Sequence, residues 1–101
     1  MKSIINGKKY DTSTAERIGE GDNGLSCDDF KYCSEQLYRK RTGEFFLYGE
    51  GGPASEYAKR CPDGWGYGEK IIPYTEAEAR EWCENHLDAD RYEAVFGPVE
   101  E

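Results

Sequence analysis

Four cysteines carry the most distinctive chemistry of this chain. They lie at Cys27, Cys33, Cys61 and Cys83, in the spacing C-x5-C-x27-C-x21-C. Four thiolates are enough for a tetrahedral zinc site, although the chain has no C-x2-C pair of the kind that marks a zinc knuckle. The alternative is a set of free, buried thiols, which are common in proteins. A zinc ion bound by these four cysteines would be structural and would pin the segment around Cys61 and the last helix to the sheet.

One histidine, His86, follows Cys83 at a spacing of three residues. In a helix the two side chains share a face, so His86 could replace one sulfur as a zinc ligand. The same pair could also supply a nucleophile and a base. A reactive thiol must be partly exposed, however, and this face of the helix is predicted to point into the core. We therefore expect no enzymatic activity and no catalytic residues.

The glycine-rich segment LYGEGGPASEY, residues 47–57, is similar to loops in which backbone N–H groups face a phosphate. It lacks the Lys-Ser/Thr pair of a P-loop and the full spacing of a dinucleotide fingerprint. In addition, Glu50 places a negative charge where the phosphate would lie. We interpret these glycines as a sharp turn of the chain out of a sheet.

The acidic residues are concentrated at one end of the chain. Residues 1–74 hold 11 basic and 12 acidic residues, a balance of −1, whereas residues 75–101 hold 2 and 9, a balance of −7, within a net charge of −8. Such a surface repels phosphate backbones, so we expect a basic protein partner and no direct binding to nucleic acid. The alternative is that the acids serve only solubility. The outward acids predicted to contact the partner are Glu76, Glu81, Glu84, Asp88, Asp90 and Glu93.

The composition predicts one domain, residues 1–101, and excludes a disordered chain. Only 37% of the residues are hydrophobic but 14% are aromatic, so we expect a core built on a few large aromatic side chains. No stretch is long and apolar enough for a membrane span, and the segment MKSIINGKKYD lacks the apolar region of a signal peptide. These features predict a cytoplasmic protein that binds no membrane and keeps its cysteines reduced.

The first half of the chain has the pattern of β structure. The segment SIINGKKYD, residues 3–11, predicts a hairpin with Asn6-Gly7 as its two-residue turn. A strand is expected near residues 15–19. Two aromatic-rich runs within residues 30–48, joined at Thr42-Gly43, predict the central β-hairpin of the fold.

The segment after the central hairpin is less regular. Pro53 suits the first turn of a helix, and we expect a short helix over residues 54–60. Residues 62–68, PDGWGYG, are predicted to form a loop. Residues 70–74 then form a short strand, limited by Pro73.

Two helices are predicted at the C-terminus. Thr75 and Glu78 have the spacing of a capping box, and a second helix is expected within residues 88–97. The residues predicted to form the inward face of the first helix are Ala79, Trp82, Cys83, His86 and Leu87. Those predicted for the second helix are Tyr92, Val95 and Phe96. The resulting fold class is α+β: a small antiparallel sheet around a central hairpin, with the C-terminal helices packed against it.

Three stretches resemble a family of small acidic proteins encoded by phages and mobile elements of Firmicutes. They are LYRKRTGEFFLYGEGGPASEYA (37–58), GEKIIPYTEAEAREW (68–82) and HLDADRYEAVFG (86–97). Some streptococcal prophage proteins of this kind are anti-CRISPR proteins that act on type II-A Cas9. The resemblance implies a non-enzymatic inhibitor that binds the Cas9 effector and prevents the loading of target DNA. It also favours a bound structural zinc ion over four free thiols, so we expect such an ion here. The alternative function is that of a small accessory or regulatory protein of a mobile element, with no nuclease target.

Overall fold

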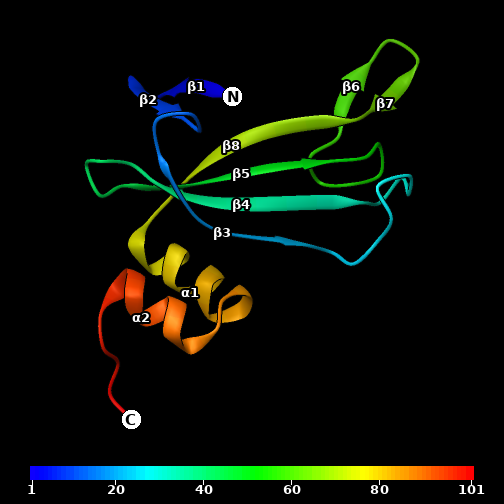
Figure 1. Cartoon of the computed structure of the whole chain (residues 1–101). Coiled ribbons are helices and arrows are strands. Elements are labelled where there is room, and N and C mark those ends of the chain that lie inside the picture. The colour runs from blue at the N-terminus through cyan, green and yellow to red at the C-terminus, as the bar shows by residue number, and fades with distance from the viewer.

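A four-stranded antiparallel sheet forms the centre of the protein. The computed structural model describes residues 1–101, and the strands of this sheet follow the order β3-β4-β5-β8 (Figure 1). Their bounds are Glu16–Asp22 for β3, Cys33–Arg39 for β4, Phe45–Gly51 for β5 and Gly68–Tyr74 for β8. The central hairpin is therefore confirmed as β4 and β5, and the α+β class is confirmed with it.

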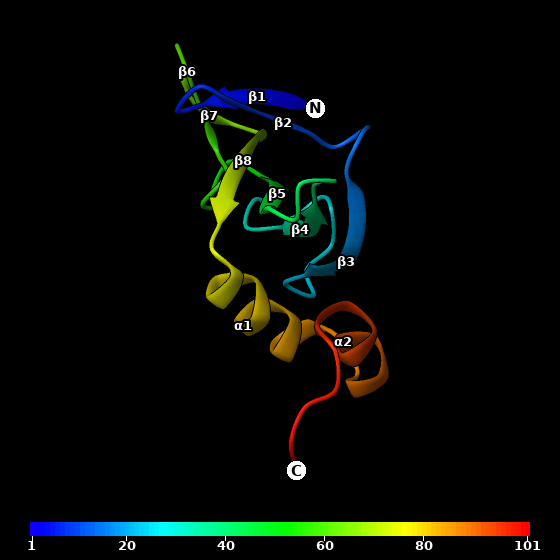
Figure 2. The same ribbon diagram turned by 90° about the vertical axis from the view of Figure 1, so that its left-hand side faces the viewer.

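Two helices cover one face of this sheet. They are α1, Glu76–His86, and α2, Ala89–Phe96, and both lie beneath the strands in two perpendicular views (Figures 1 and 2). The predicted capping box is confirmed, because the Thr75 side chain accepts a hydrogen bond from the Glu78 backbone N–H and the Glu78 side chain accepts one from the Thr75 N–H. No helix of the structure has the length and apolar character to cross a membrane.

A small hairpin lies on the opposite face of the sheet. It consists of β1, Lys2–Ile5, and β2, Lys8–Asp11, above the central strands in Figure 2. The predicted turn is confirmed, since Asn6 and Gly7 both have positive φ angles, 52° and 77°. The structure thus has three layers: the hairpin, the sheet and the helices.

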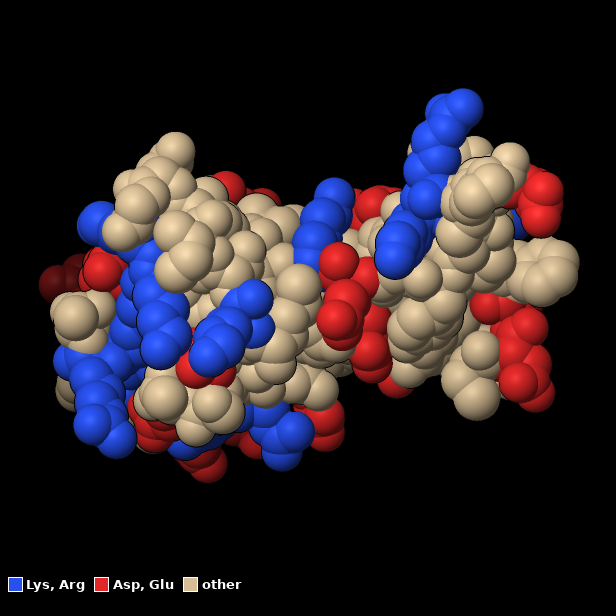
Figure 3. Space-filling view, turned by 90° about the horizontal axis from the view of Figure 1, so that it is seen from above, with Lys and Arg blue, Asp and Glu red and all other residues tan.

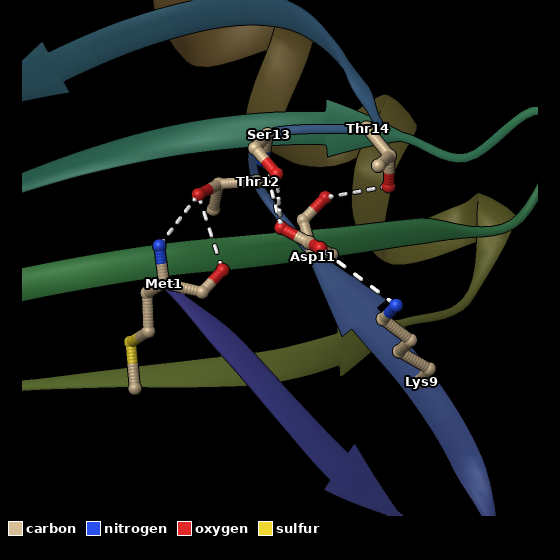
Figure 4. Close-up of polar contacts among 6 residues, drawn as sticks. All are labelled: Met1, Lys9, Asp11, Thr12, Ser13 and Thr14. Atoms are coloured by element: carbon tan, nitrogen blue, oxygen red, sulfur yellow. Dashed lines mark hydrogen bonds and ion pairs between the residues drawn. The ribbon is translucent and has the colours of Figure 1, made fainter.

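Hydrogen bonds tie the end of this hairpin to the start of the sheet (Figure 4). The backbone N–H of Thr12 donates to the Met1 carbonyl at 3.0 Å. The Asp11 carboxylate accepts bonds from the backbone N–H of Ser13 at 2.9 Å and from its hydroxyl at 2.7 Å. These two bonds hold the pKa of Asp11 below its usual value. The hairpin therefore enters β3 through a defined turn.

Each face of the sheet has its own apolar cluster. The cluster between the sheet and the helices consists of Ile18, Leu37, Phe45, Leu47, Ala79, Trp82 and Cys83. The cluster under the hairpin consists of Tyr10, Tyr38, Phe46 and Ile71. Large aromatic side chains contribute to both clusters, in agreement with the composition.

Residues 52–66 differ from the prediction in two respects. The predicted helix over 54–60 is wrong: these residues form turns and lead into a strand. Seven residues make a marginal helix, and burial of Tyr57 against the sheet, where it is 3% exposed, outweighs that local preference. The predicted loop over 62–68 is also wrong, because β6, Lys59–Cys61, pairs with β7, Gly64–Gly66. We call this two-stranded hairpin, residues 59–66, the arm.

The start of the central hairpin also requires a correction. The first strand begins at Cys33, not at Phe30, which lies in a turn with 71% of its surface exposed. The turn is closed by hydrogen bonds such as that from the Tyr32 backbone N–H to the Asp29 carbonyl, 3.0 Å. The predicted strand was therefore three residues too long, because it was based only on the alternation of aromatic residues.

Candidate functional site

The four cysteines lie in four different environments. Cys27 is exposed in the loop before β4, Cys33 begins β4, Cys61 ends β6 and Cys83 is fully buried in α1. The structure brings no group of three or more His, Cys, Asp or Glu side chains into an arrangement that could hold a metal ion. The structure therefore gives no support for a four-cysteine zinc site, and the zinc ion stays a prediction.

Cys83 and His86 have different surroundings on α1. Burial raises the pKa of the Cys83 thiol, which disfavours the reactive thiolate. The His86 ring instead stacks on Trp82, with ring centres 4.1 Å apart, and its Nδ1 lies 2.8 Å from the Trp82 carbonyl oxygen. The histidine is thus held against its own helix.

A network around Glu35 joins the sheet, the helix and the segment before the arm. The Glu35 carboxylate, on the helix side of β4, accepts a hydrogen bond from the Tyr57 hydroxyl and one from Trp82 Nε1, the latter at 3.3 Å. With His86 stacked on Trp82, four side chains from three segments are in contact. We call these four residues, Glu35, Tyr57, Trp82 and His86, the Glu35 network.

Glycines in the sheet make room for the rings of this network. A Cβ atom at Gly49 would overlap the Tyr57 ring, and one at Gly21 would lie 2.5 Å from the His86 ring. One at Gly19 would lie 2.7 Å from Leu87. This role of the glycines was not predicted from the sequence. Gly19 and Gly21, two residues apart in β3, were a usable signal, because glycine in a strand lets a neighbouring side chain lie close to the backbone.

The Tyr57 hydroxyl is kept protonated by its surroundings. Burial raises the pKa of Tyr57, and the hydrogen bond to the Glu35 carboxylate raises it further. Tyr74 lies nearby and has a raised pKa for similar reasons, burial first and the charge of Glu35 second. Both shifts favour the neutral phenol in the folded state.

We expect these shifts to cause a loss of stability at alkaline pH. An unfolded tyrosine loses its proton near pH 10. Because the folded pKa of Tyr57 is higher, its contribution is fully present below about pH 10 and is lost as the pH rises toward the folded value. Urea unfolding of the wild type and of Tyr57→Phe should give a free energy of unfolding that falls less steeply above about pH 10 in the variant. Equal slopes would contradict the assignment.

The six predicted contact acids are all exposed on the two helices. Three of them, Glu84, Asp88 and Glu93, line one cavity of about 540 Å³. The remaining lining residues are Leu87, Ala89, Tyr92 and Val99. We call this open depression the acid-rimmed cavity, because three of its seven lining residues are acidic.

The other predicted acids lie outside this cavity. Glu76 pairs with Arg80 at 3.2 Å, and Glu81 lines a separate small cavity beside Trp82. Asp90 lies in the first turn of α2. Asp88 has a second role, since its side chain accepts a hydrogen bond from the Arg91 backbone N–H at 2.8 Å and so caps α2.

Both arginines of the helical region are held against the protein. Arg80 lies over the Phe96 ring, 4.6 Å from its centre, and Arg91 donates from Nε to the Ile18 carbonyl at 3.3 Å. The carboxylates of α1 and α2 therefore dominate the outer surface of the helices. We call this surface the acidic helical face.

Basic side chains gather on the other side of the molecule. Figure 3 shows Lys and Arg concentrated at the end of the upper face that carries the β1–β2 hairpin and the turn between β4 and β5. Lys9, Lys40 and Arg41 line one pocket there together with Asp11 and Thr14. These basic residues thus lie apart from the acids of the two helices.

Comparisons with family models, with curated proteins and with solved structures found no match to this chain.

Proposed function

We propose that the protein is a non-enzymatic inhibitor that binds a Cas9-type effector through the acidic helical face and prevents the loading of target DNA. The observation that carries the proposal is the acid-rimmed cavity, which Glu84, Asp88 and Glu93 line together with apolar side chains. Charged rims select the partner and its orientation, while buried apolar groups at the centre contribute most of the binding energy.

The chemistry of the partner supports the choice. Cas9-type effectors hold nucleic acid in positively charged channels. Residues 75–101, which include the two helices, carry seven of the eight net negative charges, and such a surface competes for the channel electrostatically. Binding there obstructs the path of the DNA without any chemical step.

The second candidate is an accessory or regulatory protein of a mobile element that has no nuclease target. In that case the acids act only in solubility, and their reversal changes no binding. The measured quantity that separates the two candidates is capture of the effector by the purified protein.

The test is capture of the purified effector by immobilised wild type and by the triple variant Glu81→Lys/Glu84→Lys/Asp90→Lys. These three carboxylates are exposed and make no hydrogen bond within the fold, whereas Asp88 is spared because it caps α2. We expect the triple variant to lose capture at least a hundredfold, because it replaces attraction with repulsion across the interface.

The matched control reverses three exposed acids away from the helices, in Glu20→Lys/Asp28→Lys/Glu56→Lys. Each triple variant gains six units of charge, so both change the net charge from −8 to −2. The control should capture the effector within a fewfold of the wild type. Equal loss in both variants would show a nonspecific charge effect, and undiminished capture by the helical variant would refute the proposed interface.

A further inference from the structure

The arm presents a cationic aromatic tip. Trp65 on β7 is 58% exposed, and the Arg60 guanidinium carbon lies 5.7 Å from the centre of its ring. Lys59 is exposed beside them, and Gly64 with a φ of 132° completes the tight turn. An exposed tryptophan next to an arginine is the composition typical of residues that dominate binding energy in interfaces.

The arm is separate from the main sheet. Its two strands pair only with each other, and it projects from the end of β8 in Figure 1. A two-stranded hairpin buries little apolar surface of its own. The exposed Trp65 is therefore not needed for the core and is available for a partner.

The acid-rimmed cavity is complementary to this tip. The arm carries Lys59, Arg60 and Asp63, a balance of +1, and the cavity carries three carboxylates. Its apolar lining, with Leu87 and Tyr92, suits an indole ring, and its volume of about 540 Å³ is within the range of pockets that enclose small ligands. Cationic side chains beside the ring would then lie at the acidic rim.

The arm cannot reach the cavity of its own chain. Figures 1 and 2 place the arm and α2 at opposite ends of the molecule, whose longest dimension is 51 Å. The arm that enters a given cavity must come from a second molecule.

We propose that the protein associates head to tail, with the arm of one copy inserting Trp65 into the acid-rimmed cavity of the next, where Arg60 faces Glu84. The contact joins two different surfaces, so it extends into short chains or closes into a ring. It uses the cavity of the proposed function, and effector binding and association are then mutually exclusive. The inference itself does not depend on the effector, because both contacting surfaces belong to this chain.

Sedimentation velocity of the purified wild type across a wide concentration range tests the proposal. At low salt we expect a concentration-dependent rise in sedimentation coefficient that weakens as salt screens the rim charges. Trp65→Ala and Arg60→Glu should each weaken association at least tenfold. Arg41→Glu is the matched control, because it makes the same charge change at an exposed position far from the arm, and it should associate as the wild type does.

A charge exchange makes the assignment specific. Arg60→Glu and Glu84→Arg should each reduce self-association, and mixing the two variants should restore it, because every arm and cavity in the mixture then has a partner of opposite charge. Circular dichroism would verify that both variants fold. A wild type that stays monomeric at every concentration, or a mixture that associates no better than either variant, would overturn the proposal.

Discussion

Replacement of Gly49 with alanine is expected to destabilise the fold by about 3 kcal/mol or more. Gly49 lies in the centre of β5, paired with Glu35 on one side and Lys70 on the other, so its backbone cannot move freely. The added Cβ would overlap the Tyr57 ring. The ring must then leave the sheet and give up its hydrogen bond to Glu35.

Gly66→Ala is the control for this prediction. The Cβ added there would meet only the Cys61 sulfur closely, at 2.9 Å, and a cysteine side chain can rotate away. Urea unfolding followed by circular dichroism should show a loss below about 1 kcal/mol for Gly66→Ala. Similar losses in the two variants would mean that Tyr57 does not lie against Gly49.

Trp82→Ala is expected to cost about 3–5 kcal/mol, the range for removing a large buried aromatic side chain. Trp82 is 6% exposed and belongs to the cluster between the sheet and the helices. Its ring stacks on His86, and its Nε1 donates a hydrogen bond to Glu35. Trp82→Phe retains most of the packing but loses the hydrogen bond to the carboxylate. We expect it to cost about 1.5–3 kcal/mol.

Trp65→Ala serves as the comparison for the second prediction, because Trp65 is exposed on the arm. Its loss should change the free energy of unfolding by no more than about 0.5 kcal/mol. Circular dichroism should monitor these urea titrations, since the substitutions change the tryptophan fluorescence. If Trp82→Phe were as stable as the wild type, the hydrogen bond to Glu35 would contribute nothing to stability.

Short sequence patterns correctly predicted the elements that are stabilised by contacts between residues close in sequence. The Asn6-Gly7 turn and the Thr75 capping box involve residues that are neighbours in sequence, and both are confirmed. The inward faces of the two helices followed from periodicity, except that His86, predicted to face inward, is exposed. Ala79 and Trp82 are buried in the larger core cluster, and Tyr92 and Phe96 pack against it.

The same local reasoning failed where a distant contact decides the conformation. Residues 54–60 have acceptable helix signals. In the fold, however, Tyr57 packs against Gly49 and donates a hydrogen bond to Glu35, and these contacts hold the segment in a non-helical conformation.

The α+β class, the central hairpin, the two helices and the concentration of negative charge at the C-terminus could be predicted from the sequence. These follow from periodicity, turn chemistry and composition, which depend on short stretches of chain. The contacts between distant segments became visible only in the folded protein: the Glu35 network, the distribution of the cysteines over different elements, and the placement of the arm and the acid-rimmed cavity at opposite ends. Those arrangements depend on the register of the strands and on packing across the sheet, where one buried ring can outweigh a local preference.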